Sequence, residues 1–350
     1  MSSVNTLEIC QPDDWHLHVR DGEFLPDLLR HTASQFGRAI IMPNLRPPVT
    51  NADMAIAYKT RILNALPPGS NFEPLMVLYL TDNTSVDDVK RAKEVGVVGF
   101  KLYPAGATTN SDAGVTDIKK CADALDAMSD CGMPLLVHGE VTHSEIDVFD
   151  REAVFIEQVL EPLRARHPGL KVVFEHITTK QAAQYVESAD TTRFGAIAAT
   201  ITPQHMLYNR NAIFTGGIRP HYYCLPILKR EEHRQELVRV AISGNSRFFL
   251  GTDSAPHLKG TKENACGCAG CYTAWHAMPL YAEVFDAANA LNRLEGFASQ
   301  FGPDFYGLPR NTAKLTLRRE AQQIPNEFPM GNGTVVPLRA GETIAWSIVG

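Results

Sequence analysis

Short apolar segments recur along this chain, and each is followed within a few residues by a polar or ionisable side chain. Segments of this length that are apolar throughout are typical of strands buried on both faces of a parallel sheet. The sequence therefore predicts eight parallel strands. They comprise residues 7–10 before His16, 39–42 before Asn44, 75–80 before Thr81, 97–100 before Lys101, 134–137 before His138, 172–174 before His176, 196–201 before Thr202 and 248–250 before Asp253.

Helical patterns occupy the intervals between these segments, which indicates repeated βαβ units. The predicted helices cover residues 86–95, 118–128, 154–166, 180–187 and 230–243. The strand ends are also evenly spaced, since 37 residues separate Lys101 from His138 and 38 separate His138 from His176. This repeat favours an α/β fold of the (β/α)8 TIM-barrel type over an open doubly wound sheet. No linker divides the chain, so we expect a single barrel domain over residues 1–350, with 330–350 as a short C-terminal extension that forms a cover or hairpin.

The composition excludes several classes of protein. With 44% hydrophobic and 21% charged residues among 350, the chain is too apolar for a disordered protein and is long enough to bury a large core. Its 33 Lys and Arg and 39 Asp and Glu give a net charge of −6, and these charges are dispersed along the sequence. This balance argues against nucleic acid or an anionic membrane as partner. We therefore expect a small-molecule substrate.

The sequence also predicts a compartment. No apolar stretch approaches the roughly 18 residues of a membrane span, and the first residues lack the basic and apolar regions of a secretory leader. Seven cysteines, an odd number in a long chain, do not suggest a disulfide framework. We expect a soluble protein in the reducing cytoplasm.

Ionisable residues at the predicted strand ends form the candidate site, because the carboxyl ends of barrel strands meet at one mouth. His16 and His18 stand at i and i+2 of a strand, so their imidazoles share one face about 6–7 Å apart. An isolated His-x-His is more often a pair of hydrogen-bonded histidines than a metal site. The convergence of Lys101, Asp253 and two more histidines on the same mouth favours metal instead.

The number of ligands then indicates the type of metal site. His16, His18, Asp253, His138 and His176 are more protein ligands than one tetrahedral zinc accepts, which predicts two metals. Imidazole and carboxylate suit zinc, while manganese, cobalt and iron remain open.

Four motifs extend this pattern across nearly the whole chain. They are Trp15-His16-Leu17-His18-Val19-Arg20-Asp21-Gly22, Met42-Pro43-Asn44, Gly99-Phe100-Lys101-Leu102-Tyr103-Pro104 and Gly251-Thr252-Asp253-Ser254-Ala255-Pro256-His257. The cluster resembles the amidohydrolase superfamily, and the motifs closely resemble its compact, monofunctional bacterial dihydroorotase family. The resemblance implies a hydrolase that reversibly cyclises N-carbamoyl-L-aspartate to L-dihydroorotate in de novo pyrimidine biosynthesis, and it implies a homodimer.

The same resemblance implies that Lys101 is carbamylated to N6-carboxylysine and bridges two zinc ions. His16, His18, Lys101 and Asp253 would hold one ion, and Lys101, His138 and His176 the other. An ammonium beside two dications would be repelled, whereas a carbamate supplies an anionic bridge. The alternative is an unmodified Lys101 paired with Asp253.

A water between two such cations loses its proton near neutral pH, its pKa falling from about 15.7 to roughly 7. The resulting metal-bridging hydroxide would attack the cyclic amide. Asp253 would act as the catalytic proton shuttle, taking the proton of the hydroxide and delivering it to the departing nitrogen.

Substrate contacts are carried over from the same family. Arg20, expected on the same strand face as His18, offers a bidentate grip on a carboxylate, which Asn44 and His257 would complete. Residues 103–114 resemble a mobile lid over the barrel mouth, in which Thr108 and Thr109 would hydrogen-bond the substrate. Leu225 and Ala269 would contribute backbone contacts to its ring.

Three alternatives stay open at this point. Cys224, Cys266, Cys268 and Cys271 could form a structural zinc site or remain free thiols. The enzyme could be another cyclic amidohydrolase, of hydantoinase or allantoinase type. The chain could also be a non-catalytic homologue that acts as a scaffold. The remaining histidines have no spacing that suggests chemistry, and we take them as structural or solvated.

Overall fold

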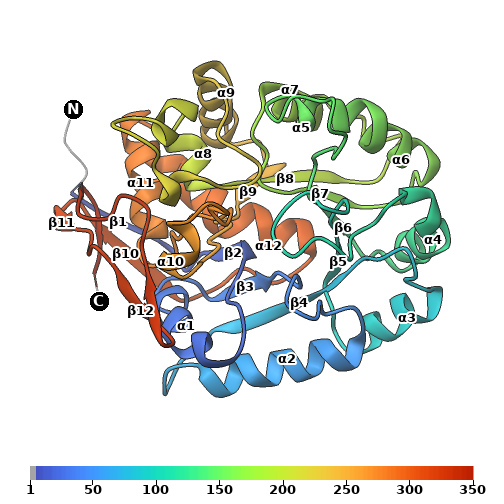
Figure 1. Ribbon diagram of the computed structural model, residues 1–350, viewed down its shortest axis with the longest axis horizontal. Helices are drawn as coiled ribbons and strands as arrows, with labels where there is room; N and C mark the ends of the chain where they lie inside the picture. The colour runs from blue at the N-terminus through green and yellow to red at the C-terminus, as the bar shows by residue number, and fades with distance from the viewer. Residues whose placement is uncertain (1–4, 350) are drawn as a thin grey trace.

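Eight parallel strands form a closed (β/α)8 TIM barrel in the computed structural model, which describes residues 5–349 (Figure 1). Each strand pairs with the next along the chain, and a bridge between Leu17 and Ser254 joins the last strand to the first. The strands are β2 (Asp13–Leu17), β3 (Arg38–Ile41), β4 (Glu73–Tyr79), β5 (Gly99–Leu102), β6 (Leu135–Val137), β7 (Val172–Phe174), β8 (Ile197–Ile201) and β9 (Phe248–Leu250).

The strands alternate their side chains between two apolar cores, as the two-residue period of a strand requires. In β3, Ile40 points into the barrel and belongs to a cluster with Trp15, Val77 and Phe249. Its neighbour Ile41 belongs to the outer core, between the sheet and the surrounding helices. Because both faces are buried, apolar sequence is a good signal for these strands.

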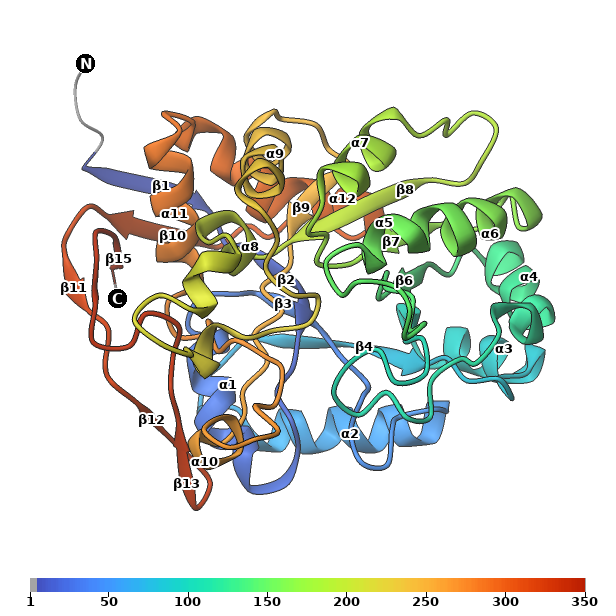
Figure 2. The same cartoon turned by 45° about the horizontal axis from the view of Figure 1, so that its top comes forward.

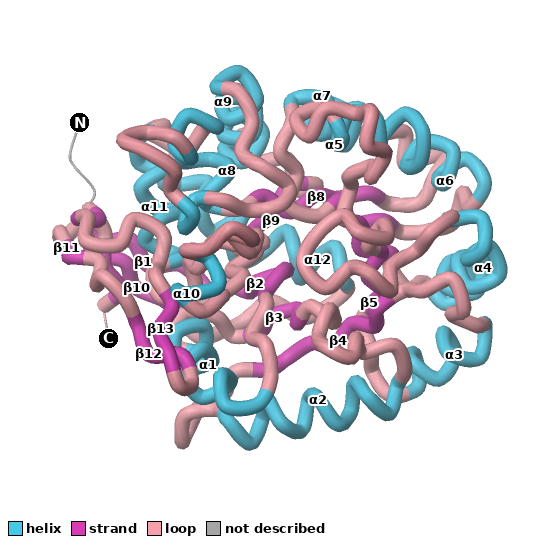
Figure 3. Tube along the Cα trace, in the orientation of Figure 1, coloured by secondary structure: helices cyan, strands magenta, loops and turns pink. Residues whose placement is uncertain are grey.

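Helices surround the barrel, and loops cover its mouth (Figure 3). Several begin at side-chain caps, such as Asn51, Ser85 and Thr179, whose oxygens accept backbone N–H groups of the first turn. The helices are α1 (Leu25–Ala33), α2 (Ala52–Ala65), α3 (Val86–Glu94), α4 (Ala122–Cys131), α5 (Arg151–Phe155), α6 (Glu161–Arg166), α7 (Lys180–Ser188), α8 (Pro203–Leu207), α9 (Glu231–Ile242), α10 (Lys259–Lys262), α11 (Ala277–Ala287) and α12 (Phe301–Tyr306). No helix of residues 5–349 combines the length and apolar character needed to cross a bilayer.

Two helical predictions need refinement. The interval 118–128 opens as a 3-10 turn over Ile118–Cys121 before α4 begins. The interval 154–166 starts earlier, at Arg151, and contains a π-helical turn over Ile156–Leu160 between α5 and α6. The other predicted helices match α3, α7 and α9 within two residues at each end.

The first predicted strand is wrong. Residues 7–10 lie in β1 (Thr6–Cys10), which pairs antiparallel with β10 (Lys314–Arg318) outside the barrel. The first barrel strand is instead β2, which begins with two buried aspartates that no apolar pattern reveals. Asp13 forms an ion pair with the guanidinium of Arg38 at 2.6 Å. The carboxylate of Asp14 accepts hydrogen bonds from the backbone N–H and the hydroxyl of Thr252. These partners satisfy the buried carboxylates, so the strand forms despite its polarity.

The C-terminal segment packs beside the barrel, and its residue Met330 lies against the loops of the barrel mouth (Figure 2). Its strands are β11 (Gln322–Gln323), β12 (Phe328–Met330), β13 (Gly333–Val335), β14 (Thr343–Ile344) and β15 (Ser347–Ile348). β12 and β13 form a hairpin, and β15 joins β1 and β10 in one sheet. The opposite end of the barrel is closed by α12, where Tyr306 stacks on Trp15 with ring centroids 4.6 Å apart.

Candidate active site

A small enclosed cavity lies at the carboxyl ends of the barrel strands. Its volume is about 20 Å³, room for roughly one water molecule. It is lined by His16, His18, Arg20, Asn44, Tyr103, Thr108, Thr109, His138, His176, Leu225, Asp253, Ala255, Ala269 and Gly270. Every predicted site residue except Lys101 and His257 lines this cavity, so the structure brings together segments that are far apart in the sequence.

Imidazole and carboxylate groups form a continuous row along one wall of the cavity. Asp253 Oδ1 lies 3.1 Å from His18 Nε2 and 3.5 Å from His16 Nε2. The potential ligand atoms of these three residues all lie within 4.8 Å of one another. The ring centroid of His176 is 4.8 Å from that of His16 and 4.9 Å from that of His138. Nitrogen and carboxylate oxygen at this spacing can bind a divalent metal.

Lys101 lies inside β5 rather than after it, and it does not line the cavity. Its side chain is fully buried, and its ammonium nitrogen has no hydrogen-bond partner among the described residues. The nitrogen lies 5.2 Å from the ring centroid of Tyr103, a residue that does line the cavity. Burial lowers the pKa of Lys101 to about 8. A buried group with three unused donors is costly unless a further group binds or modifies it.

Buried ring nitrogens of two histidines also lack hydrogen-bond partners at the same place. They are Nδ1 of His138 and Nδ1 of His176. Together with Lys101 they supply the orphaned polar atoms that a bound cation pair and a modified lysine would satisfy. The residues present therefore fit the expected metals.

Two buried glutamates orient the histidines, and sequence reasoning missed both. His16 Nδ1 donates to Glu175 at 2.9 Å, and His138 Nε2 donates to Glu140 at the same distance. Each bond fixes which ring nitrogen is left to face the cavity. The only feature of the sequence that could have identified these glutamates is their position beside predicted metal ligands. Glu175 precedes His176, and Glu140 lies two residues after His138.

Backbone conformation at two of these positions is unusual. His176 and Asp253 have positive φ angles of 39° and 44°, which cost energy for residues other than glycine. The His176 N–H donates to the hydroxyl of Thr200 at 2.7 Å, and the Asp253 N–H donates to the His16 carbonyl at 2.8 Å. Neighbouring strands thus hold both side chains toward the cavity.

Burial also sets the charge of the site. It lowers the pKa of His16 and lowers the pKa of His18 and His176 well below the ordinary value. These imidazoles are therefore neutral near pH 7, the form that binds metal. Burial raises the pKa of Asp253, and the neighbouring His16 and Lys101 offset part of that rise.

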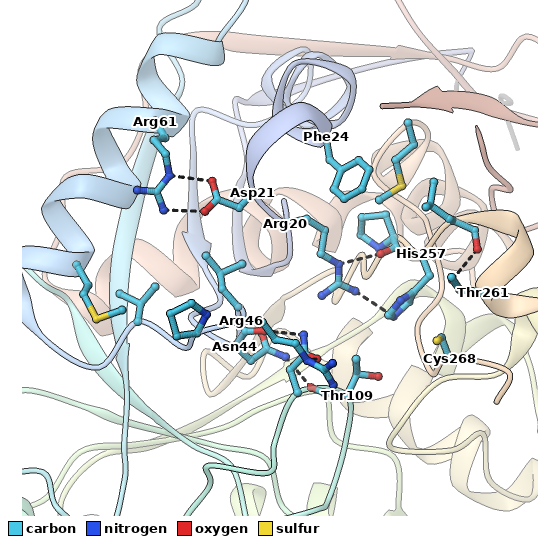
Figure 4. Close-up of a pocket in the computed structure, with 18 of the residues that line it drawn as sticks. Arg20, Asp21, Phe24, Asn44, Arg46, Arg61, Thr109, His257, Thr261 and Cys268 are labelled. Atoms are coloured by element: carbon cyan, nitrogen blue, oxygen red, sulfur yellow. Dashed lines mark hydrogen bonds and ion pairs between the residues drawn. The ribbon is translucent and has the colours of Figure 1, made fainter. Parts of the chain in front are cut away.

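Arg20 is not placed as expected. It was predicted on the same strand face as His18, but β2 ends at Leu17 and Arg20 has a φ of 58°. Its guanidinium is directed instead by contacts across the mouth (Figure 4). Nε donates to the Pro256 carbonyl at 2.8 Å, and Nη2 lies 3.1 Å from His257 Nε2.

The predicted lid, residues 103–114, contributes Tyr103, Thr108 and Thr109 to the cavity lining. Asn44 Nδ2 donates to the Thr109 carbonyl at 3.0 Å, and the Thr109 hydroxyl donates to the Ala269 carbonyl at 3.4 Å. A larger cavity of about 690 Å³, here called the vestibule, adjoins the closed one (Figure 4). Its lining includes Arg20, Phe24, Asn44, Thr109, His257 and Met330. Arg20 and Asn44 line both cavities, whereas His257 faces the vestibule.

The four cysteines near the mouth do not gather into one set of metal ligands. Cys266 Sγ and Cys268 Sγ lie 3.8 Å apart, while Cys224 and Cys271 are buried. Within residues 5–349, the group formed by His16, His18 and Asp253 is the only one of three or more such ligands close enough to share a metal.

Comparisons with known proteins identify the family of this chain. The sequence profile of the amidohydrolase family matches residues 13–324. A curated dihydroorotase from Cupriavidus pinatubonensis is 68% identical over 341 residues, which cover 97% of this chain and 98% of that protein. A crystal structure of a Campylobacter jejuni dihydroorotase superposes with a TM-score of 0.90 at 36% identity, covering 100% of this chain and 99% of that one. A Saccharomyces cerevisiae dihydroorotase in complex with 5-fluoroorotic acid superposes with a TM-score of 0.89 at 33% identity, covering 99% of both chains. This chain therefore belongs to the amidohydrolase family and, within it, to the dihydroorotase family.

Proposed function

We propose that this chain is a dihydroorotase, which interconverts N-carbamoyl-L-aspartate and L-dihydroorotate in de novo pyrimidine biosynthesis. One observation carries the proposal: Arg20 and Asn44 line the same closed cavity as the cluster of His16, His18 and Asp253. A hydrolytic cluster alone suits any cyclic amide. A guanidinium beside it selects a ring that also bears a carboxylate.

The proposed cofactors are two zinc ions, with Lys101 present as N6-carboxylysine. His16, His18, Asp253 and modified Lys101 would hold one ion, and Lys101, His138 and His176 the other. Carbamylation joins the lysine nitrogen to the carbon of carbon dioxide with loss of a proton, and the lowered pKa of Lys101 favours the neutral amine that this reaction needs. When bound, the metals supply Lewis acidity and lower the pKa of water.

The side chains of the chain supply positioning and proton transfer. Asp253 is the proposed catalytic residue: its carboxylate takes a proton from the attacking water and returns it to the departing amide nitrogen. Arg20, Asn44 and His257 would bind the substrate carboxylate. The hydroxyls of Thr108 and Thr109 would contact the substrate from the closed lid, and Leu225 and Ala269 would contact its ring through their backbone.

We also propose that the chain acts in the cytoplasm as a homodimer and that residues 1–350 form one domain. All seven cysteines are free thiols, which supports a reducing compartment. Light scattering of the purified protein tests the dimer, since a monomer mass would contradict it.

The decisive experiment is hydrolysis of L-dihydroorotate by the purified chain, compared with hydantoin and dihydrouracil. We expect turnover of dihydroorotate alone, loss of activity with a chelator, recovery with zinc, and about two zinc ions per chain. Intact mass should show one added carbon dioxide, located on Lys101. Asp253→Asn should lose activity, whereas the control Asp130→Asn, on the exposed surface of α4, should keep it. Preference for hydantoin, or zinc-loaded protein without activity, would overturn the proposal in favour of another amidohydrolase or a scaffold.

A further inference from the structure

Lys262 is a buried cation whose ammonium donates hydrogen bonds to backbone carbonyls and lies 5.9 Å from the ring centroid of Tyr223. Its side chain, at the end of α10, is 3% exposed. The ammonium donates to three carbonyls, those of Tyr223 at 3.1 Å, Cys268 at 2.7 Å and Gly270 at 2.7 Å. These bonds use all three of its N–H groups. No carboxylate of residues 5–349 forms an ion pair with it. Burying a charge without a counter-ion costs free energy, so the buried position of the Lys262 ammonium needs an explanation.

The three carbonyls belong to the two segments that complete the wall of the closed cavity. Cys268 and Gly270 flank Ala269, and Tyr223 lies two residues before Leu225. Ala269 and Leu225 both line the cavity. Gly270 N–H also donates to the Tyr223 carbonyl at 3.0 Å, which ties the two segments directly.

The carbonyl of Ala269 makes different contacts from the carbonyls on either side of it. While its neighbours bind Lys262, the Ala269 oxygen accepts from His257 Nε2 at 3.0 Å and from the Thr109 hydroxyl of the lid at 3.4 Å. His257, Thr109 and Cys268 all border the vestibule in Figure 4. Fixing the carbonyls before and after Ala269 leaves its own peptide little freedom to rotate.

We propose that Lys262 is a positioning residue, whose ammonium fixes the turn 268–270 against Tyr223. In this position the Ala269 carbonyl can accept hydrogen bonds from His257 and from Thr109 of the closed lid. The proposal deepens the function proposed above and rests on it for its kinetic consequence. Lys262 does not line the closed cavity and acts through Ala269. Without the cation, the three carbonyls lose their shared donor and the turn can rotate away from the lid.

The test compares Lys262→Met with Lys259→Met in the zinc-loaded protein. Lys259 is a matched control, because it lies on the same short helix but its ammonium is exposed and 3.4 Å from Glu327. We expect Lys262→Met to raise KM for dihydroorotate about tenfold, the effect of losing roughly one good hydrogen-bonding group, with a smaller change in kcat. Zinc content should stay the same in both variants. An unchanged KM in folded Lys262→Met, even with a lower melting temperature, would overturn the proposal.

Chemical rescue separates the charge from simple packing. Lys262→Ala leaves a space beside the three carbonyls that methylammonium can enter with three N–H donors. We expect methylammonium to lower the raised KM of Lys262→Ala and to leave the wild type unchanged. Absence of rescue, together with normal KM in the unsupplemented variant, would contradict a positioning role.

A second measurement does not depend on activity. Because the lid rests on Ala269, limited proteolysis between residues 104 and 114 should be faster in Lys262→Met or Lys262→Ala than in Lys259→Met, with or without zinc. Equal cleavage rates would overturn the inference. If the wild type failed to hydrolyse dihydroorotate while the lid still loosened in the Lys262 variants, the proposed function would fail and the positioning role would stand.

Discussion

At the scale of single residues, two buried glutamates give neighbouring histidines opposite orientations. Glu175 accepts from Nδ1 of His16, which leaves Nε2 to face Asp253. Glu140 accepts from Nε2 of His138, which leaves Nδ1 as the free ring nitrogen. Glu175 is itself held by the hydroxyl of Thr200 at 2.6 Å. The ligand atoms thus depend on carboxylates that do not line the closed cavity.

The charge of Glu175 should therefore matter more than its size. Glu175→Gln keeps the shape but removes the negative charge that stabilises the Nδ1–H form of His16. We expect zinc affinity to fall about 10- to 100-fold, as is usual when such a supporting carboxylate is lost. Competition with a chromogenic chelator measures this directly. Glu157→Gln, at an exposed position after α5, is the matched control. Equal zinc affinity in both variants would show that Glu175 only fills space.

At the scale of elements, sequence reasoning succeeded where burial alone decides structure. β6, β7 and β9 are short and buried on both faces, so their apolar sequences identified them. β2 was missed because its polar side chains are satisfied by partners distant in the sequence, such as Arg38 and Thr252. No pattern within the strand itself contains that information.

The residues of the candidate site fall into two groups: those that a sequence motif identifies and those that only a tertiary contact reveals. Motif residues could be placed from sequence, because their spacing follows the strands. Glu140, Glu175 and Lys262 could not, since each acts through a tertiary contact and none has a characteristic spacing. Arg20 was identified from its motif, but its position depends on the Pro256 carbonyl rather than on its own strand.

Asn110 supplies two of the hydrogen bonds that tie residues 103–114 to the loop after β3, beside those of Asn44 and Thr109. Asn110 Nδ2 donates to the Asn44 carbonyl at 3.1 Å, and its Oδ1 accepts from Arg46 Nε at 2.7 Å. Asn110 also has a φ of 56°, a conformation that asparagine tolerates better than most residues. The closed cavity, at about 20 Å³, is smaller than a six-membered ring, so the proposed substrate requires these residues to move aside before it can enter.

Replacing Asn110 should weaken lid closure. Asn110→Ala removes two hydrogen bonds and adds backbone strain, which together destabilise the closed lid by about 1–3 kcal/mol. We expect KM for dihydroorotate to rise several-fold and proteolysis of the lid to accelerate. Asn110→Gly removes the same bonds without the strain and should give the smaller effect. If neither variant differed from the wild type in steady-state kinetics, the Asn110 contacts would not hold the lid.

At the scale of the whole molecule, the C-terminal segment is joined to the barrel by buried polar contacts. His276, just before α11, lies with its Nε2 3.0 Å from the Leu338 carbonyl, and the Leu338 N–H donates to the Tyr272 carbonyl at 2.8 Å. Trp346 is fully buried and donates to Asp286. These contacts attach residues beyond β13 to α11 and to the segment just before it.

The burial of His276 should make folding sensitive to acid. Burial lowers the pKa of His276 to about 3, whereas an unfolded histidine titrates near 6.5. Between these values the unfolded chain binds a proton that the folded chain does not. The free energy of unfolding therefore falls as pH decreases through this window, by up to about 1.4 kcal/mol per pH unit for this one group.

Substituting His276 separates its contribution to the pH dependence of unfolding from the contributions of the other histidines. His276→Gln can still donate to the Leu338 carbonyl but cannot titrate, so its urea midpoint should decline less steeply than that of the wild type between pH 6.5 and 4.5. The metal-site histidines are unchanged and cancel in the comparison. His143→Gln, at an exposed position in the loop after β6, should retain the wild-type slope. A slope in His276→Gln equal to that of the control would mean that this imidazole is protonated in the folded protein, and that the C-terminal segment does not depend on its neutral form.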